Sequence, residues 1–257
     1  MRIVRFEMND SLYFGVIKDD SDKVVVLNSD PLFSSKIEPT GQIVDLVDVR
    51  LLSTVLPRSK ALGLRIDANG NIADVHIKPN TSVIGPNVAI VKPDVRVKKV
   101  SSSTSLGVVI KRICKNVDVK DIRKYVLGFT VVNDIAIEID NWDSLGHKSE
   151  HSASICSLFD TSCVVGPWVV VDKDFDVNNL QMKSLIDDTT VKTFSTSQLG
   201  DIYAHISTIS KYCTLLPSDI VFINSKENAI TVPDNCVIKC DIENIGTLRN
   251  ALLTEDE

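Results

Sequence analysis

Short runs of β-branched and alternating apolar residues follow one another along almost the whole chain. Clear examples are KVVVLN, LGVVIKRI and GPWVVVD, with turn-forming polar residues between the runs. Runs of this kind predict β-strands. Apolar residues occur at helical spacing in DVKDIRKYV, in QLGDIYAHISTISKYC and in part of GQIVDLVDVRLLS. The first segment begins with an aspartate that can cap a helix, and Ser195 or Ser197 can cap the second. The sequence therefore predicts an α+β fold that is rich in strands and poor in helices.

The first 56 residues are expected to form a small domain of their own. The runs IVRFEM, LYFGVIK and KVVVLN, separated by Asn and Asp, predict a small antiparallel meander. Pro57 marks a junction after this region because proline interrupts regular structure. We expect a small N-terminal β domain at residues 1–56 and a larger domain at residues 57–257.

The charge balance and the lengths of the apolar runs exclude several classes of protein. The chain has 257 residues, of which 34 are acidic and 28 basic, so its formal net charge is −6. Nucleic-acid binding needs a basic face, a membrane-spanning helix needs about 20 apolar residues, and secretion needs a signal segment. We find none of these patterns and expect a cytoplasmic protein that binds neither nucleic acid nor membrane, with its six cysteines as free thiols.

Seven segments form a specific pattern because they occur together, in one order and at consistent spacing. They are VRLLSTVLPRSKALG (49–63), KPNTSVIGP (78–86), GFTVVND (128–134), FDTSCVVGPWVV (159–170), FSTSQLGDIYAHIS (194–207), TLLPSDIVF (214–222) and DIENIGTLRN (241–250). Together they resemble the fumarylacetoacetate hydrolase family. The resemblance implies a small N-terminal domain, a larger β-rich domain described as a β-roll, and a dimer.

The resemblance also implies a chemistry and a set of site positions. Members of the family cleave, decarboxylate, hydrate or isomerise 2-oxo acids and β-diketo acids, with a divalent metal, usually magnesium, held by three carboxylates. The family's Glu-x-Glu pair falls on Ser103 and Ser105, just before the LGVVI run, and its third metal ligand falls on Asp134. Two of the three carboxylates are therefore replaced by hydroxyls, which are neutral and weak ligands for magnesium.

Other family positions are replaced as well. The family's histidine base falls on Asn69, its arginine on Glu138, its substrate-binding lysine on Ser157, and its glycine-threonine-proline turn on residues 224–226. We therefore expect a binding, structural or regulatory member that has lost magnesium and its chemistry, with no other cofactor. It would form a homodimer or pair with an active homologue. The alternative is an active hydrolase, isomerase or decarboxylase of small 2-oxo or dienedioic acids that uses Asp134 with unconventional ligands.

Several remaining residues allow two interpretations. Asp134 could be a relic metal ligand, or a strand-end aspartate that caps a turn. His147 and His151 lie in a polar segment that is expected to be a solvated loop, but with Asp134 and Glu138 they could form a replacement site for zinc or another transition metal. The basic run VKPDVRVKK, which ends at Lys99, could be a solvated strand face or an anion site. Cys163 is expected in the core.

Overall fold

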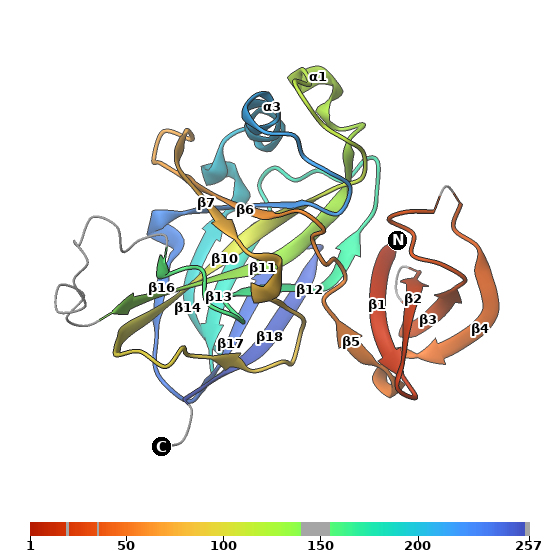
Figure 1. Ribbon diagram of the computed structural model, residues 1–257, viewed down its shortest axis with the longest axis horizontal. Helices are drawn as coiled ribbons and strands as arrows, with labels where there is room; N and C mark the ends of the chain where they lie inside the picture. Colours follow the sequence, from red (N-terminus) through yellow and green to blue (C-terminus); the bar gives the residue numbers. More distant parts are fainter. Residues whose placement is uncertain (19–20, 35, 140–154, 255–257) are drawn as a thin grey trace.

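The computed structural model describes residues 1–18, 21–34, 36–139 and 155–254, and these residues form two β-sheets with few helices (Figure 1). The larger sheet contains β1 (Arg2–Met8), β2 (Ser11–Ile17), β3 (Lys23–Leu27), β4 (Pro39–Asp45), β5 (Arg50–Leu52), β6 (Ala61–Ile66), β7 (Ile72–Lys78), β8 (Val83–Ile84), β10 (Val97–Ile110), β11 (Val126–Ile139), β12 (Cys163–Val170), β15 (Ile220–Ser225) and β16 (Ile230–Val232). The smaller sheet contains β9 (Ile90–Val91), β13 (Gln181–Ile186), β14 (Thr189–Ser195), β17 (Cys236–Ile242) and β18 (Gly246–Leu253). The predicted α+β fold, rich in strands, is confirmed.

Helices form a minor part of the described chain. The α-helices are α1 (Val119–Ile122) and α3 (Ile202–Tyr212), and they lie together beyond one end of the sheets, at the top of Figure 1. Short 3-10 turns occur at Leu46–Asp48, Asn80–Ser82, Thr196–Leu199 and Lys226–Asn228. In the described part of the chain no helix combines the length and the apolarity needed to span a membrane.

The larger sheet runs through the N-terminal strands into the rest of the molecule. Its strand order is β4-β3-β2-β1-β12-β11-β10-β15-β6-β7, with β5 paired to β1, β8 to β12 and β16 to β10. The link is the antiparallel pairing of β1 with β12, in which Arg2 lies opposite Val170 and Ile3 opposite Val169. The N-terminal strands, at the right of Figure 1, still have a small core of their own that includes Phe6.

The larger sheet is rolled up. In the strand order β7 lies four strands from β11, a distance of roughly 19 Å in a flat sheet. Yet the amine of Lys78 at the end of β7 lies 3.0 Å from a carboxylate oxygen of Asp134 on β11. The sheet must curl until β7 faces β11 across its inside, and β8, which follows β7, then pairs with β12.

The curled sheet separates two kinds of side chain. Because successive residues of a strand point to opposite faces, Leu106 and Val108 of β10 pack outward against the smaller sheet and α3 in the main core. Val109 of β10 and Phe222 of β15 point inward and form a second, smaller core inside the curl. The inner face is apolar at this end and polar at the other.

Three predicted local features differ from the structure. GQIVDLVDVRLLS has no α-helix: it forms β4, a 3-10 turn and β5, because pairing with β3 and β1 supplies its backbone hydrogen bonds. The helix in DVKDIRKYV is the single turn α1, and Asp118 makes no side-chain capping bond to it. Asp201 caps α3 through Ala204, whereas Ser195 caps the preceding 3-10 turn.

Candidate functional site

The serine-rich segment of β10 alternates between the two faces of the curled sheet. Ser102 donates a hydrogen bond of 2.7 Å to Asn133, and Thr104 shares one of 2.7 Å with Ser184 of the smaller sheet, so both belong to the core between the sheets. Ser103 and Ser105 point to the inner face by the period of two. The strand therefore presents two hydroxyls where the resemblance places two metal-binding carboxylates.

Asp134 lies in the middle of β11, directly opposite Ser103 of β10. The strand continues to Ile139, so the interpretation of Asp134 as a turn cap at a strand end is wrong. Its side chain is 3% exposed. A buried carboxylate needs compensating charge or hydrogen bonds, and β7 and β15 supply both.

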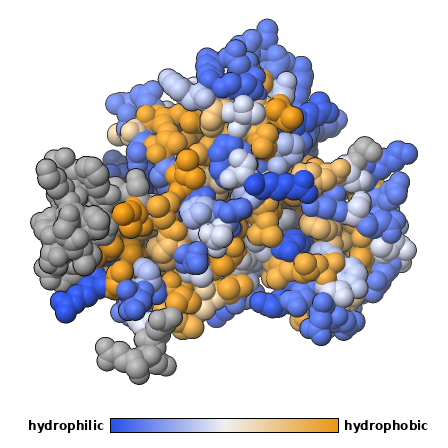
Figure 2. Space-filling model, viewed as in Figure 1, coloured by the Kyte–Doolittle hydropathy of each residue, from blue (hydrophilic) through white to orange (hydrophobic). Residues whose placement is uncertain are grey.

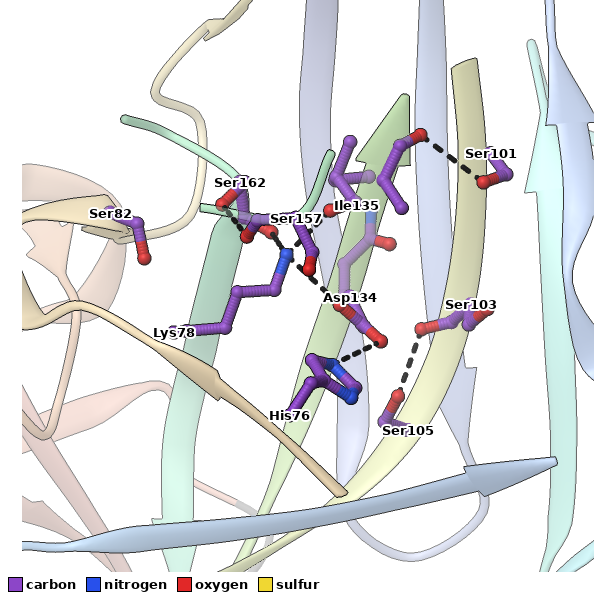
Figure 3. Close-up of polar contacts among 12 residues, drawn as sticks. His76, Lys78, Ser82, Ser101, Ser103, Ser105, Asp134, Ile135, Ser157 and Ser162 are labelled. Atoms are coloured by element: carbon purple, nitrogen blue, oxygen red, sulfur yellow. Dashed lines mark hydrogen bonds and ion pairs between the residues drawn. The ribbon is translucent and has the colours of Figure 1, made fainter. Parts of the chain in front are cut away.

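Lys78 provides the charge. Its side chain is fully buried, with its amine 3.0 Å from Oδ1 of Asp134 (Figure 3). The same amine donates hydrogen bonds to the carbonyl oxygens of Ile135, at 2.5 Å, and Ser162, at 3.0 Å. Lys78 thus joins the end of β7 to β11 and to the residue before β12. Its three oxygen neighbours match the three hydrogens of an ammonium group.

His76 and Asn224 contact the other carboxylate oxygen of Asp134. Nε2 of His76 lies 3.2 Å from Oδ2, and Nδ2 of Asn224 donates to the same oxygen at 3.2 Å. Asn224 also donates to the hydroxyl of Ser105 at 2.9 Å, so one amide joins the two family positions. Burial by itself raises the pKa of the Asp134 carboxyl, but the ammonium of Lys78, with help from His76, holds that pKa well below its usual range.

The space for His76 exists because its neighbour across the strands is a glycine. Gly63 of β6 lies opposite His76 in the ladder, and a Cβ at Gly63 would come within 2.2 Å of the imidazole ring. The ring packs edge-on against Phe222 of β15, with 5.5 Å between ring centres. Gly63 therefore lets an imidazole enter the inner face beside Asp134.

A cavity of about 590 Å³ opens beside Asp134. Its polar lining includes Ser103 and Asn224 with Asp134, and its charged rim is formed by Arg65, Lys99, Glu138 and Lys226. Glu138, the residue at the family's arginine position, forms an ion pair of 2.6 Å with Lys98, and this hydrogen bond lowers the pKa of the Glu138 carboxyl. The cavity holds charged side chains of both signs around a floor of hydroxyl and amide groups.

The other predicted positions lie in different environments. Asn69 is an exposed residue in the turn between β6 and β7, where its backbone N–H donates to Asp67, and it is not part of the cavity lining. Ser157 is buried near Lys78: its carbonyl oxygen accepts a hydrogen bond of 3.0 Å from Ser162 (Figure 3). Cys163 is buried opposite Asp134, and burial raises the pKa of its thiol to about 12, as expected of a core residue.

His147 and His151 lie outside the described residues, so the alternative metal site that would include them stays a prediction. Glu138, the other residue of that alternative, lies on the same strand as Asp134, four positions further along. It points to the same face of β11 because the interval is even.

The donor set beside Asp134 does not fit a magnesium ion. Magnesium takes six hard oxygen ligands, usually including carboxylates, whereas Ser103 and Ser105 offer neutral hydroxyls. The hydroxyl of Ser105 already donates to the Ser103 carbonyl and accepts from Asn224. The remaining carboxylate has the ammonium of Lys78 at 3.0 Å. Within the described ranges no three His, Cys, Asp or Glu side chains group as a metal site.

Some of the site residues that were not predicted can be recognised by a pattern in the sequence. His76 and Lys78 are two apart in the run IADVHIK, which is not among the predicted strands. On a strand these two residues share a face, and a lysine on a buried face needs an acidic partner. The identity of that partner was not readable, because Asp134 lies more than 50 residues further along the chain. Asn224 stands in the sequence only as part of a replaced family turn, and no sequence pattern marks Arg65 as a site residue.

Comparison with known proteins gives matches over nearly the whole chain. The model of a family described as fumarylacetoacetate (FAA) hydrolase C-terminal matches residues 59–253, and a model described as Rv2993c-like, N-terminal matches residues 1–53. Protein Rv2993c of Mycobacterium tuberculosis is 31% identical over 226 residues, which cover 83% of this chain and 82% of that protein.

Solved structures match over the full length. The crystal structure of 2-hydroxyhepta-2,4-diene-1,7-dioate isomerase from Mycobacterium marinum has a TM-score of 0.87 and 28% identity, with 100% of both chains covered. Maleylpyruvate hydrolase from Sphingobium sp. SYK-6, in complex with manganese (II) ion and pyruvate, has a TM-score of 0.80 and 22% identity, again with 100% of both chains covered. At that identity the second match shows a shared fold.

Proposed function

Because this chain belongs to the fumarylacetoacetate hydrolase family, we propose that it is a member that keeps the hydrolase- and isomerase-like fold and has lost the magnesium chemistry. It would act as a binding, structural or regulatory protein. The observation that carries the proposal is that hydroxyls of Ser103 and Ser105 stand at two of the three family carboxylate positions, while the Asp134 carboxylate is ion-paired with Lys78 and hydrogen-bonded by Asn224. The single carboxylate left at the three family positions is satisfied by the protein itself.

The energetics of the pair support this proposal. A divalent cation beside Asp134 would lie close to the Lys78 ammonium, which is 3.0 Å from the same carboxylate. Like charges repel strongly in a buried site, and two serine hydroxyls add no negative charge to offset that repulsion. Lys78 also donates to two carbonyl oxygens, so moving it away would leave buried acceptors unpaired at a cost of about 1–3 kcal/mol each.

Calorimetric titration with Mg²⁺ and Mn²⁺, with and without oxalate as an enolate mimic, tests the proposal. We expect no binding at micromolar metal concentrations and no gain from oxalate. Asp134→Asn is the matched control, because it removes the carboxylate while keeping size and hydrogen-bonding capacity. Micromolar binding that oxalate strengthens and Asp134→Asn abolishes would overturn the proposal.

A second candidate is an active hydrolase, isomerase or decarboxylase of small 2-oxo or dienedioic acids with an unconventional site. The position of Asp134 at the floor of the 590 Å³ cavity favours it, as does the likeness to a structure named as an isomerase. Turnover of oxaloacetate and acylpyruvates measures it directly. Activity that Asp134→Ala leaves unchanged would exclude a site built on this residue.

We also propose an assembly and a location for the protein. A binding or regulatory member would form a homodimer or pair with an active homologue in the cytoplasm. Light scattering on the purified chain, alone and mixed with an active homologue from the same cells, distinguishes the two assemblies. A monomer in both samples would argue against either one.

A further inference from the structure

The described residues that line the cavity beside Asp134 include three basic and two acidic side chains, although the whole chain has a formal net charge of −6. We propose that this cavity binds a small dianion directly through Lys99 and Lys226, that it recognises negative charge rather than a 2-oxo group, and that it needs no metal. This inference rests on the proposed loss of the magnesium chemistry. In effect, fixed cations of the protein take over the positive charge that a metal would supply.

Three of the charged side chains that line the cavity form ion pairs with neighbouring residues. Asp134 is paired with the buried Lys78, and Glu138 with Lys98 at 2.6 Å. Arg65 is 3.4 Å from Asp74. The opposite charges within each of these three ion pairs nearly cancel, so the pairs contribute little to the electrostatic field in the cavity.

Two cations on the rim remain after that pairing. Lys99 lies across the strand ladder from Glu138, whose own ion pair is with Lys98, and Lys226 follows the end of β15. Neither lysine forms an ion pair with any residue that the structure describes. Glu227, the next acid along the chain, lines an adjoining hollow rather than this cavity. Among the residues that the structure describes, these two lysines leave a net charge of about +2 at the cavity, which matches a dianion.

Hydroxyl groups on the cavity wall can complete the recognition. Ser103 and Ser225 are each 9% exposed and line the cavity. The hydroxyl of Ser225 accepts a hydrogen bond of 3.1 Å from the backbone N–H of Glu227, which leaves its own hydrogen to donate. Glutamates at positions 103 and 105 would place two negative charges here. The serines therefore change the preferred ligand from a cation to an anion.

The absence of a chelating metal predicts an unusual selectivity. A metal distinguishes 2-oxo acids because it binds the carboxylate and the oxo oxygen together, whereas ammonium and guanidinium groups respond to the charge and the oxygen positions of a carboxylate or phosphate. A dicarboxylate with an oxo group and one without it should therefore bind alike. Carboxylates and phosphates share this chemistry.

Calorimetry in the presence of EDTA tests the inference with three probes: glutarate, 2-oxoglutarate and inorganic phosphate. We expect glutarate and 2-oxoglutarate to bind within about threefold of each other, more weakly at high salt. Lys226→Gln and Lys99→Gln should each weaken binding roughly tenfold, as loss of one hydrogen bond to a charged group does. Lys192→Gln, in the smaller sheet, is the matched control and should bind as the wild type does.

Each outcome has a distinct meaning. Binding of phosphate alone supports the anion site and assigns it to phosphate esters rather than dicarboxylates. No binding of any probe at millimolar concentration overturns the anion site but leaves the metal-free proposal standing on its own titration. The same titrations are repeated with Mg²⁺ or Mn²⁺ in place of EDTA, and binding of 2-oxoglutarate that occurs only with the metal, with glutarate excluded, overturns both. The two lysines are exposed, so their variants should fold normally, which circular dichroism verifies.

Discussion

Replacing Lys78 by methionine should destabilise the protein strongly, because it leaves the buried Asp134 carboxylate without its counter-charge. Methionine has a similar length and is apolar, so the change mainly removes charge. At 3.0 Å and an effective dielectric constant of about 20, the Coulomb attraction of the pair is roughly 5–6 kcal/mol. Part of it is offset because the ammonium no longer has to be taken out of water.

The expected net loss is about 3–5 kcal/mol, the usual result of removing one partner from a buried ion pair. A typical domain is stable by about 5–15 kcal/mol, so Lys78→Met should remain folded at low temperature. Its melting temperature should fall by roughly 6–20 °C. Urea denaturation followed by circular dichroism gives the free energy of unfolding of each variant.

The double-mutant cycle with Asp134→Asn isolates the pair. Each single variant leaves one buried charge alone, whereas Lys78→Met/Asp134→Asn leaves none. The double variant should therefore be more stable than the sum of the single losses predicts, by roughly 1–3 kcal/mol. Effects that add within about 0.5 kcal/mol, or a Lys78→Met variant as stable as the wild type, would refute the reasoning from a buried ion pair.

Three further predictions concern the same region. The folded-state pKa of Asp134 is lowered, so its stabilising effect is present above its unfolded pKa of about 3.9 and is lost as pH falls toward the folded value. The urea midpoints of the wild type and Asp134→Asn should therefore converge below pH 4. A gap between the two midpoints that stays constant with pH would contradict this. The double variant Ser103→Glu/Ser105→Glu should be less stable than the wild type in EDTA, by about 2–4 kcal/mol, because it buries two more carboxylates. It should regain part of this stability in millimolar Mg²⁺, because a bound ligand stabilises the folded state. A melting temperature of the variant that Mg²⁺ does not change would count against the site geometry. Burial raises the pKa values of the Cys163 and Cys240 thiols to about 12. A thiol-modifying disulfide reagent at pH 8 should therefore leave both cysteines unmodified in the folded protein, which mass spectrometry can verify. Rapid labelling of either cysteine would show that it is accessible.

The strand content and the family resemblance were readable from the chain because both depend on local patterns. The strand CVIKCDI shows its period of two within seven residues, and LGVVI is a short, continuously apolar run. The family resemblance also placed Ser103, Ser105 and Asp134 together at the three metal-ligand positions. The structure indeed places Ser103 opposite Asp134 and joins Ser105 to it through Asn224.

What sequence patterns could not supply is the curl of the larger sheet. The neighbours of Asp134 come from β7 and β15, which lie more than 50 residues away along the chain on either side. Their approach depends on how far the sheet rolls, and no local propensity encodes that angle. The helical interpretation of GQIVDLVDVRLLS failed for a related reason, since pairing with β3 and β1 overrides the spacing of its apolar residues.

The outward face of β7 carries apolar residues, in contrast to its polar inward face. His76 and Lys78 point inward, and so Val75 and Ile77 of β7 point outward, where both are exposed. Apolar residues gather below the helices over β6 and β7 in the space-filling view (Figure 2). A charge pair inside the curl is thus accompanied by an apolar strip outside it.

The pairing of β1 with β12 joins two strands that the ribosome synthesises at different times. Val170, the partner of Arg2, is added to the growing chain roughly 10–30 s after Arg2 at normal translation speeds. During that interval the N-terminal strands can form their own small core, while the edge of β1 that will meet β12 stays open. An open strand edge is a template for pairing with another chain. A nascent chain paused before residue 170 should therefore be the form most dependent on chaperones.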